Sequence, residues 1–158
     1  MMTNQSAKNT KPGTILVATD FDEPSAKAVE YAVELARKFG ARLRVLHVTR
    51  EMVFYSPAFG GYMPSREQYA AGANAMLESI ISTADTEDLD VVAEHRFGSP
   101  DVEIVKRASS LETPLIVVGT HGRNAAATVL MGSVAAKVVQ HAPCPVLTVH
   151  ADERESVS

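Results

Sequence analysis

The chain has 158 residues, of which 46% are hydrophobic and 22% charged, and its net charge is −4. This length fits one domain, and the composition is typical of a soluble globular protein. The negative charge gives no general attraction for nucleic acid or an anionic membrane surface, so neither partner is expected. With no apolar run long enough for a membrane span or a signal peptide, and with a single cysteine, the sequence predicts a cytoplasmic protein.

Apolar β-branched runs alternate with amphipathic segments along the chain. The runs predict strands, and the segments, whose apolar residues recur at helical spacing, predict helices. The expected elements are a strand at 14–18, a helix from Glu23 that stops at Gly40, a strand at 42–48, a helix from Pro64 or Ser65 to about Ala84, a strand at 91–97, a helix opened by Gly98-Ser99-Pro100-Asp101, a strand at 115–118, a helix at 132–140 and a strand at 146–149. This order demands an α/β fold in which a parallel sheet carries helices on both faces.

Three segments do not fit this alternation. Residues 1–12 are polar and predict a disordered tail, and 151–158 predict a charged tail, so that the domain spans 13–150. Residues 52–63 place aromatic and methionine side chains among glycines and a proline, which predicts a long loop. Such a loop could cover a ligand or dock a partner, or it could fold over the sheet with its side chains half buried.

The segment from Gly119 to Ser133 carries the strongest functional signal. Two residues separate Gly119 from Gly122, nine separate Gly122 from Gly132, and Ser133 follows directly. The segment leads from a predicted strand into a predicted helix. Bare glycines let a phosphate approach the backbone, and the first N–H groups of a helix have no internal partner and a favourable dipole. The pattern therefore predicts a nucleotide-phosphate site, although each glycine alone could equally end a strand or relieve crowding.

Asp20 follows the first predicted strand, as the glycine segment follows the fourth. Ligands of parallel sheets bind outside the carboxyl ends of the strands, where the strand order reverses. A reversal between the first and fourth strands would bring Asp20 beside the glycines. Asp20 could instead favour the start of the next helix, a role that Asp22 could share.

His141 and Cys144 are three positions apart and raise the question of a metal site. No second pair of ligands accompanies them, so a packed cysteine before the last strand is the favoured interpretation.

No nucleophile or paired carboxylate lies near His121 in the sequence, so it is not predicted to be a catalytic base. Any hydrolysis of a bound nucleotide would be slow.

The chain resembles the universal stress protein family over about residues 13–150. The matching pieces are Ile15-Leu-Val-Ala-Thr-Asp20, Leu46-His-Val48, Val118-Gly-Thr-His-Gly-Arg123, Met131-Gly-Ser-Val134 and His141-Ala-Pro-Cys-Pro-Val146. The resemblance implies a five-stranded sheet in the order 3-2-1-4-5 and dimers formed through the last strand. The spacing G-x2-G-x9-G-[ST] marks the family's ATP-binding class.

The resemblance also implies a set of binding residues. Base and ribose would lie beside Ala18, Thr19 and Asp20, with Val48 against the adenine. The phosphates would be lined or bound by Gly119, His121, Gly122, Arg123, Gly132, Ser133 and Val134. Residues 124–131 contain no cation, so charge compensation for a triphosphate is thin, and we expect Mg²⁺ with Asp20 as a candidate ligand.

The first functional hypothesis is an ATP-binding regulatory protein of the stress response, in which the nucleotide changes the order of loops 50–63 and 120–131 for an unknown protein partner. The alternative is a nucleotide-independent interaction module. The missing cations in 124–131 favour the alternative, and the complete glycine spacing opposes it. An enzyme that uses the nucleotide as substrate is a third hypothesis, for which no catalytic acid or base is available.

The last predicted strand lies at the edge of the sheet. Because an edge strand exposes open hydrogen-bonding groups, a homodimer is expected through Val146, Leu147, Thr148 and Val149.

Overall fold

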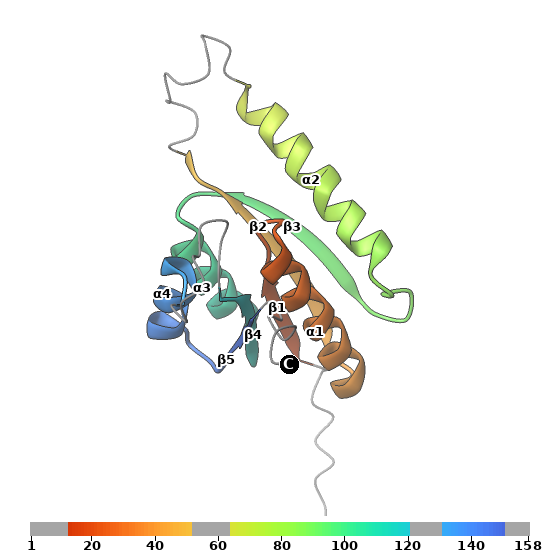
Figure 1. The fold of residues 1–158 in the computed structure, drawn as a ribbon. Coiled ribbons are helices and arrows are strands. Elements are labelled where there is room, and N and C mark those ends of the chain that lie inside the picture. Colours follow the sequence, from red (N-terminus) through yellow and green to blue (C-terminus); the bar gives the residue numbers. More distant parts are fainter. Residues whose placement is uncertain (1–12, 52–63, 121–130, 151–158) are drawn as a thin grey trace, which may run out of the picture.

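The computed structural model describes residues 13–51, 64–120 and 131–150, which form a sheet flanked by helices (Figure 1). The elements in chain order are β1 (Thr14–Ala18), α1 (Glu23–Phe39), β2 (Arg42–Thr49), α2 (Arg66–Thr83), β3 (Val91–Phe97), α3 (Pro100–Leu111), β4 (Leu115–Gly119), α4 (Ser133–His141) and β5 (Val146–Val149). Within these ranges no helix is both long and apolar enough to cross a membrane. The predicted tails and the 52–63 loop lie outside the described residues.

All five strands are parallel, and their order is β3-β2-β1-β4-β5, which confirms the predicted topology. The chain moves outward from β1 to β3 and then returns to the other side of β1 to form β4. Leu16 of β1 is therefore paired with Arg44 of β2 on one side and Ile116 of β4 on the other. The strand order reverses between β1 and β4, so the carboxyl ends of these strands lie side by side.

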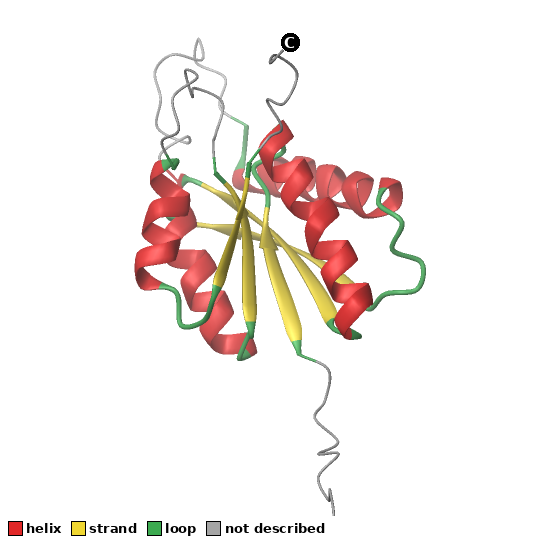
Figure 2. Ribbon diagram, turned by 60° about the horizontal axis from the view of Figure 1, so that its bottom comes forward, coloured by secondary structure: helices red, strands yellow, loops and turns green. Residues whose placement is uncertain are grey.

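Helices cover both faces of the sheet (Figure 2), and alternation along the strands divides the core between these two faces. Val17 and Val45 pack with α1 and with Leu77 of α2 on one face. Leu16 and Leu46, one position away in each strand, pack with α3 and α4 on the other face. Buried parallel strands need apolar residues on both sides, which explains why their sequences are nearly continuous apolar runs.

The helix ends follow the predicted capping signals with small shifts. Gly40 ends α1 in the left-handed region at φ 62°, where glycine has no steric penalty. Ser65 is the N-cap of α2 and forms a capping box with Gln68, so the helix proper begins at Arg66. Ser99 is the N-cap of α3, but its hydroxyl donates to Asp101 Oδ1 (2.7 Å) rather than capping the backbone.

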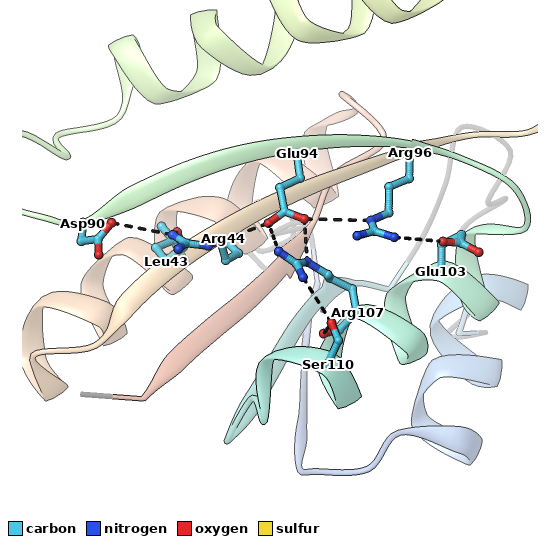
Figure 3. A network of polar contacts seen from close by, with 8 residues as sticks. All are labelled: Leu43, Arg44, Asp90, Glu94, Arg96, Glu103, Arg107 and Ser110. Atoms are coloured by element: carbon cyan, nitrogen blue, oxygen red, sulfur yellow. Dashed lines mark hydrogen bonds and ion pairs between the residues drawn. The ribbon is translucent and has the colours of Figure 1, made fainter. Parts of the chain in front are cut away.

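A charged network connects α3 to β2 and β3 (Figure 3). Glu94 of β3 receives two hydrogen bonds from Arg107 of α3, one of them from Nε to Oε2 at 2.6 Å. Arg44 of β2 and Arg96 of β3 approach the same carboxylate at 3.8 and 4.0 Å. The side chain of Glu94 is only 16% exposed, so these contacts operate largely out of bulk water. The network thereby sets the position of α3 relative to the sheet.

Candidate functional site

A cleft of about 470 Å³ lies at the carboxyl ends of β1, β2 and β4, against the first turns of α3 and α4. Its size is in the range of ligand pockets, and its place at the reversal of strand order is where ligands bind in such sheets. Every predicted binding residue within the described ranges lines it: Ala18, Thr19, Asp20, Val48, Gly119, Gly132, Ser133 and Val134. His121, Gly122 and Arg123 lie outside the described residues.

Hydroxyl groups fix the turn between β1 and α1. The hydroxyls of Thr19 and Ser25, both buried, are hydrogen-bonded at 3.1 Å, and Ser25 Oγ also accepts from the backbone N–H of Asp20 at 3.3 Å. Phe21 donates its N–H to Thr19 Oγ1 (3.1 Å) and takes φ 69°, which is uncommon for a residue with a side chain. The turn thus holds Asp20 at the cleft. Ser25 lines the cleft too, and the sequence analysis missed it.

Asp20 and Asp22 interact in the same turn but have different functions. Asp22 is the N-cap of α1 and accepts from the Ser25 N–H (3.2 Å), so the capping role considered for Asp20 belongs to Asp22. Asp20 Oδ1 accepts from the Asp22 N–H at 3.3 Å. Burial acts to raise the pKa of Asp20, but hydrogen bonds with Asp22 and Ser25 bring that pKa below its ordinary value. Asp20 therefore presents a negative charge to the cleft.

The pKa of the Asp22 carboxyl is raised to about 6, first by burial and then by the hydrogen bond and charge of Asp20. Since the pKa is higher in the folded than in the unfolded chain, the protonated carboxyl stabilises the fold, and this contribution is lost as pH rises from about 4 through 6. Asp22→Asn keeps a good N-cap without the charge. We expect the variant to gain about 1 kcal/mol relative to wild type over this pH range, because solvent screens a partly exposed carboxyl.

Urea denaturation of wild type and Asp22→Asn at several pH values between 4 and 7 measures this difference. A constant difference in the free energy of unfolding across that range would contradict the raised pKa. The Asp22→Ala variant controls for the cap itself, and should cost about 1 kcal/mol relative to the Asn variant at every pH.

The β4 end and the start of α4 are tied to each other by one residue. The carbonyl oxygen of Thr120 accepts from the Gly132 N–H at 2.5 Å, and the Thr120 N–H donates to the Val149 carbonyl at 2.9 Å. Gly132 is the N-cap of α4 and offers no capping side chain. The first turn of α4, with the Ser133 hydroxyl, therefore faces the cleft without a side-chain cap, an arrangement suited to an anion.

His47 lines the cleft and supports the end of β1. Its Nδ1 donates to the Thr19 carbonyl oxygen at 2.8 Å, and its ring lies 4.2 Å from that of Phe21 and 5.9 Å from that of His95, measured between centroids. Burial lowers the pKa of His47, so the ring is neutral near pH 7. In the sequence, His47 is part of the matching piece Leu46-His-Val48, and no role was predicted for it. Its role in holding the end of β1 depends on a contact between strands.

His141 and Cys144, the pair considered for a metal site, have other contacts in the structure. His141 Nδ1 donates to the Lys137 carbonyl at 2.9 Å, and Cys144 is half-buried against the core between the sheet and helices α3 and α4. In the part of the chain that the structure describes, no group of three or more potential metal-binding side chains is found. Cys144 therefore occupies a packing position, as the sequence analysis favoured.

The chain belongs to the universal stress protein family, whose model matches residues 12–150. Universal stress protein YxiE of Bacillus subtilis is 34% identical over 143 residues, which cover 85% of this chain and 97% of the relative. The structure of universal stress protein UspA from Lactobacillus plantarum is similar with a TM-score of 0.70 and 28% identity, covering 89% of this chain and 99% of that one. A universal stress protein in complex with cAMP is similar with a TM-score of 0.62 and 26% identity, covering 89% and 98%.

Proposed function

We propose that the cleft binds an adenine nucleotide and that the chain is a nucleotide-binding regulatory protein of the cytoplasmic stress response, with ATP as the expected ligand. The observation that carries this proposal is the convergence of the predicted binding residues on one cleft at the β1–β4 reversal. The relative in complex with cAMP supports an adenine nucleotide as the class of ligand. A purely structural role for these residues would not require them to line a common cavity.

The described residues divide naturally between the two ends of a nucleotide. The first turn of α4, from Gly132 to Val134, would donate backbone N–H groups and the Ser133 hydroxyl to phosphate oxygens. Asp20, ionised at the end of β1, would accept from the ribose or the base, and Val48 would contact the adenine. A carboxylate near phosphates favours a divalent cation, so Mg²⁺ would reduce the repulsion when bound.

Regulation requires that the nucleotide bind two states of the protein with different affinity, because equal affinity shifts no equilibrium. Residues 50–63 and 120–131 follow the ends of β2 and β4 in the sequence, and we propose that nucleotide changes the order of these loops and that a protein partner recognises this change. We also propose a homodimer through β5, the edge strand at Val146–Val149. Binding and release of the nucleotide, rather than its hydrolysis, would be the functional event.

The test removes donors from the first turn of α4 without breaking the helix. Ser133→Pro deletes one hydroxyl and one N–H at the first helical position, where proline is well tolerated. Arg66→Pro likewise removes one backbone N–H at the first position of α2, whose residues do not line the cleft, together with the ion pair of Arg66 to Glu51. Calorimetric titration with ATP and Mg²⁺ should show at least roughly tenfold weaker binding for Ser133→Pro and unchanged binding for Arg66→Pro.

The same samples distinguish the proposal from its alternative. Circular dichroism establishes that each variant is folded, light scattering gives the mass of the particle, and excess chelator tests the need for Mg²⁺. A wild-type dimer that binds no adenine nucleotide would refute the proposal and favour the interaction module. A monomer would refute the proposed β5 interface, and an unchanged affinity in chelator would refute the role of Mg²⁺.

A further inference from the structure

We infer that Arg50 binds the phosphate of the nucleotide and so makes the cleft select phosphorylated nucleosides over nucleosides. The inference rests on the proposed nucleotide binding and adds a residue to it. Arg50 follows β2 directly and lines the cleft together with Gly132 and Ser133 of the α4 start. The sequence pattern pointed only to Arg123, the single arginine of the segment from Gly119 to Ser133, as a cation for the phosphates.

The backbone around Arg50 is fixed at the cleft. The carbonyl oxygen of Thr49, the residue before it, accepts from the Gly98 N–H at 3.0 Å. This hydrogen bond continues the β2–β3 pairing up to the turn that leads into α3 at Pro100, which is another lining residue. The guanidinium is thus carried on a strand end whose position is set by the sheet and by the start of α3. A long side chain placed in this way can reach a ligand without a change of the backbone.

The donors of Arg50 are available to a ligand. Its guanidinium makes no hydrogen bond or ion pair with any residue in 13–51, 64–120 or 131–150, and the side chain is exposed. The carboxylate near it, Asp101, already accepts from the Ser99 hydroxyl (2.7 Å) and faces Lys137 Nζ at 3.9 Å. Arg50 acts on Asp101 only through its charge. Asp101 therefore keeps a favourable field at Arg50 without occupying its N–H groups.

The charge balance of the cleft gives Arg50 its expected effect. Among the described lining residues, the formal charges at neutral pH are the carboxylate of Asp20 and the guanidinium of Arg50. Among the described lining residues, Arg50 is thus the cation that offsets Asp20, beside the dipoles at the start of α4. Guanidinium groups bind phosphate through two parallel N–H donors and are always charged, which suits them to this function. Arg50 thus supplies from β2 a cation that residues 124–131 lack.

The test compares ligands that differ only in phosphate. Wild type, Arg50→Gln and Arg50→Lys are titrated with adenosine, AMP, ADP and ATP, each at low and high salt. Lys38→Gln is the matched control, because it removes one exposed cation from the last turn of α1, at the far end of the sheet. We expect Arg50→Gln to lose roughly tenfold in affinity for the three phosphorylated ligands, with adenosine unchanged and a weaker salt dependence. Arg50→Lys should recover part of the loss.

The outcomes separate this inference from the proposed function. If wild type binds AMP or ATP and Arg50→Gln binds them equally well, the inference is overturned while nucleotide binding stands. An equal loss for adenosine and for AMP would also overturn it, because Arg50 would then contact the base or support the cleft. If wild type binds none of the four ligands, the proposed function fails and the inference fails with it.

Discussion

Gly119→Ala is expected to destabilise the protein by about 1–3 kcal/mol, the usual cost of forcing an extra methyl group into a packed site. A Cβ at this position would lie 2.8 Å from the carbonyl carbon of Pro24, 2.9 Å from its oxygen and 3.0 Å from the nitrogen of Ser25. These are backbone atoms in the first turn of α1, which cannot move aside as a flexible side chain could. The end of β4 and the start of α1 are therefore in contact through the missing side chain.

The matched control is Gly72→Ala, in the exposed middle of α2, where a Cβ would meet nothing within 4 Å. It should stabilise the protein by about 0.5–1 kcal/mol, since alanine is the better helix former. Urea denaturation of both variants, with equal m-values, would give the two effects with opposite sign. A Gly119→Ala variant as stable as wild type would mean that α1 can shift, and the packing explanation for this glycine would be wrong.

Gly119, the first glycine of the motif, thus has a packing role against α1. The sequence suggested that bare glycines let phosphate approach the backbone, but at Gly119 the close neighbour is α1 itself. Ser25, one of the residues that a Cβ would displace, also holds Thr19 and Asp20 in place. Loss of nucleotide binding in Gly119→Ala would therefore not identify a phosphate contact. Ser133→Pro and Arg50→Gln are better tests for that reason.

The fold was predictable because its determinants are local. Apolar runs and helical periodicity gave each strand and helix to within about two residues, and caps such as Gly40 and Ser65 set most of the ends. The strand order was implied by the family resemblance rather than by any pattern of spacing. Where the ends differ, as at Ser133 for α4, the cap residue had been counted as part of the helix.

The candidate site was predictable where it depends on strand ends and glycine spacing, and not where it depends on contacts across the fold. Ser25 looks like an ordinary residue in the first turn of a helix, and only the structure places its hydroxyl against Thr19. Arg50 lies outside every motif, and its relation to α4 follows from the β1–β4 reversal. A useful signal for a residue such as Arg50 is a cation within two positions of the carboxyl end of a predicted parallel strand, whereas Ser25, seven positions beyond β1, carries no such signal.

Glu94→Gln is expected to cost roughly 2–3 kcal/mol, somewhat less than breaking a fully buried ion pair, because the carboxylate is 16% exposed. Three arginines converge on it: Arg107 with two hydrogen bonds, and Arg44 and Arg96 as close charges (Figure 3). A neutral amide leaves these cations facing one another, and the NH2 group of the amide would point a donor at a guanidinium. The penalty should persist at high salt, since screening acts mainly on exposed charges.

The charge-matched control is Glu78→Gln, on the exposed side of α2, which should change the free energy of unfolding by less than about 0.5 kcal/mol. A double-mutant cycle with Arg107→Gln separates the pair from the rest of the network, and a coupling of at least about 1 kcal/mol is expected. Because Pro100 and Ile104 of α3 line the cleft, weaker fixation of α3 should also lower nucleotide affinity in Glu94→Gln, without changing the discrimination between adenosine and AMP. Stability equal to that of Glu78→Gln would show that the arginines find other partners and that α3 is held by its apolar contacts alone.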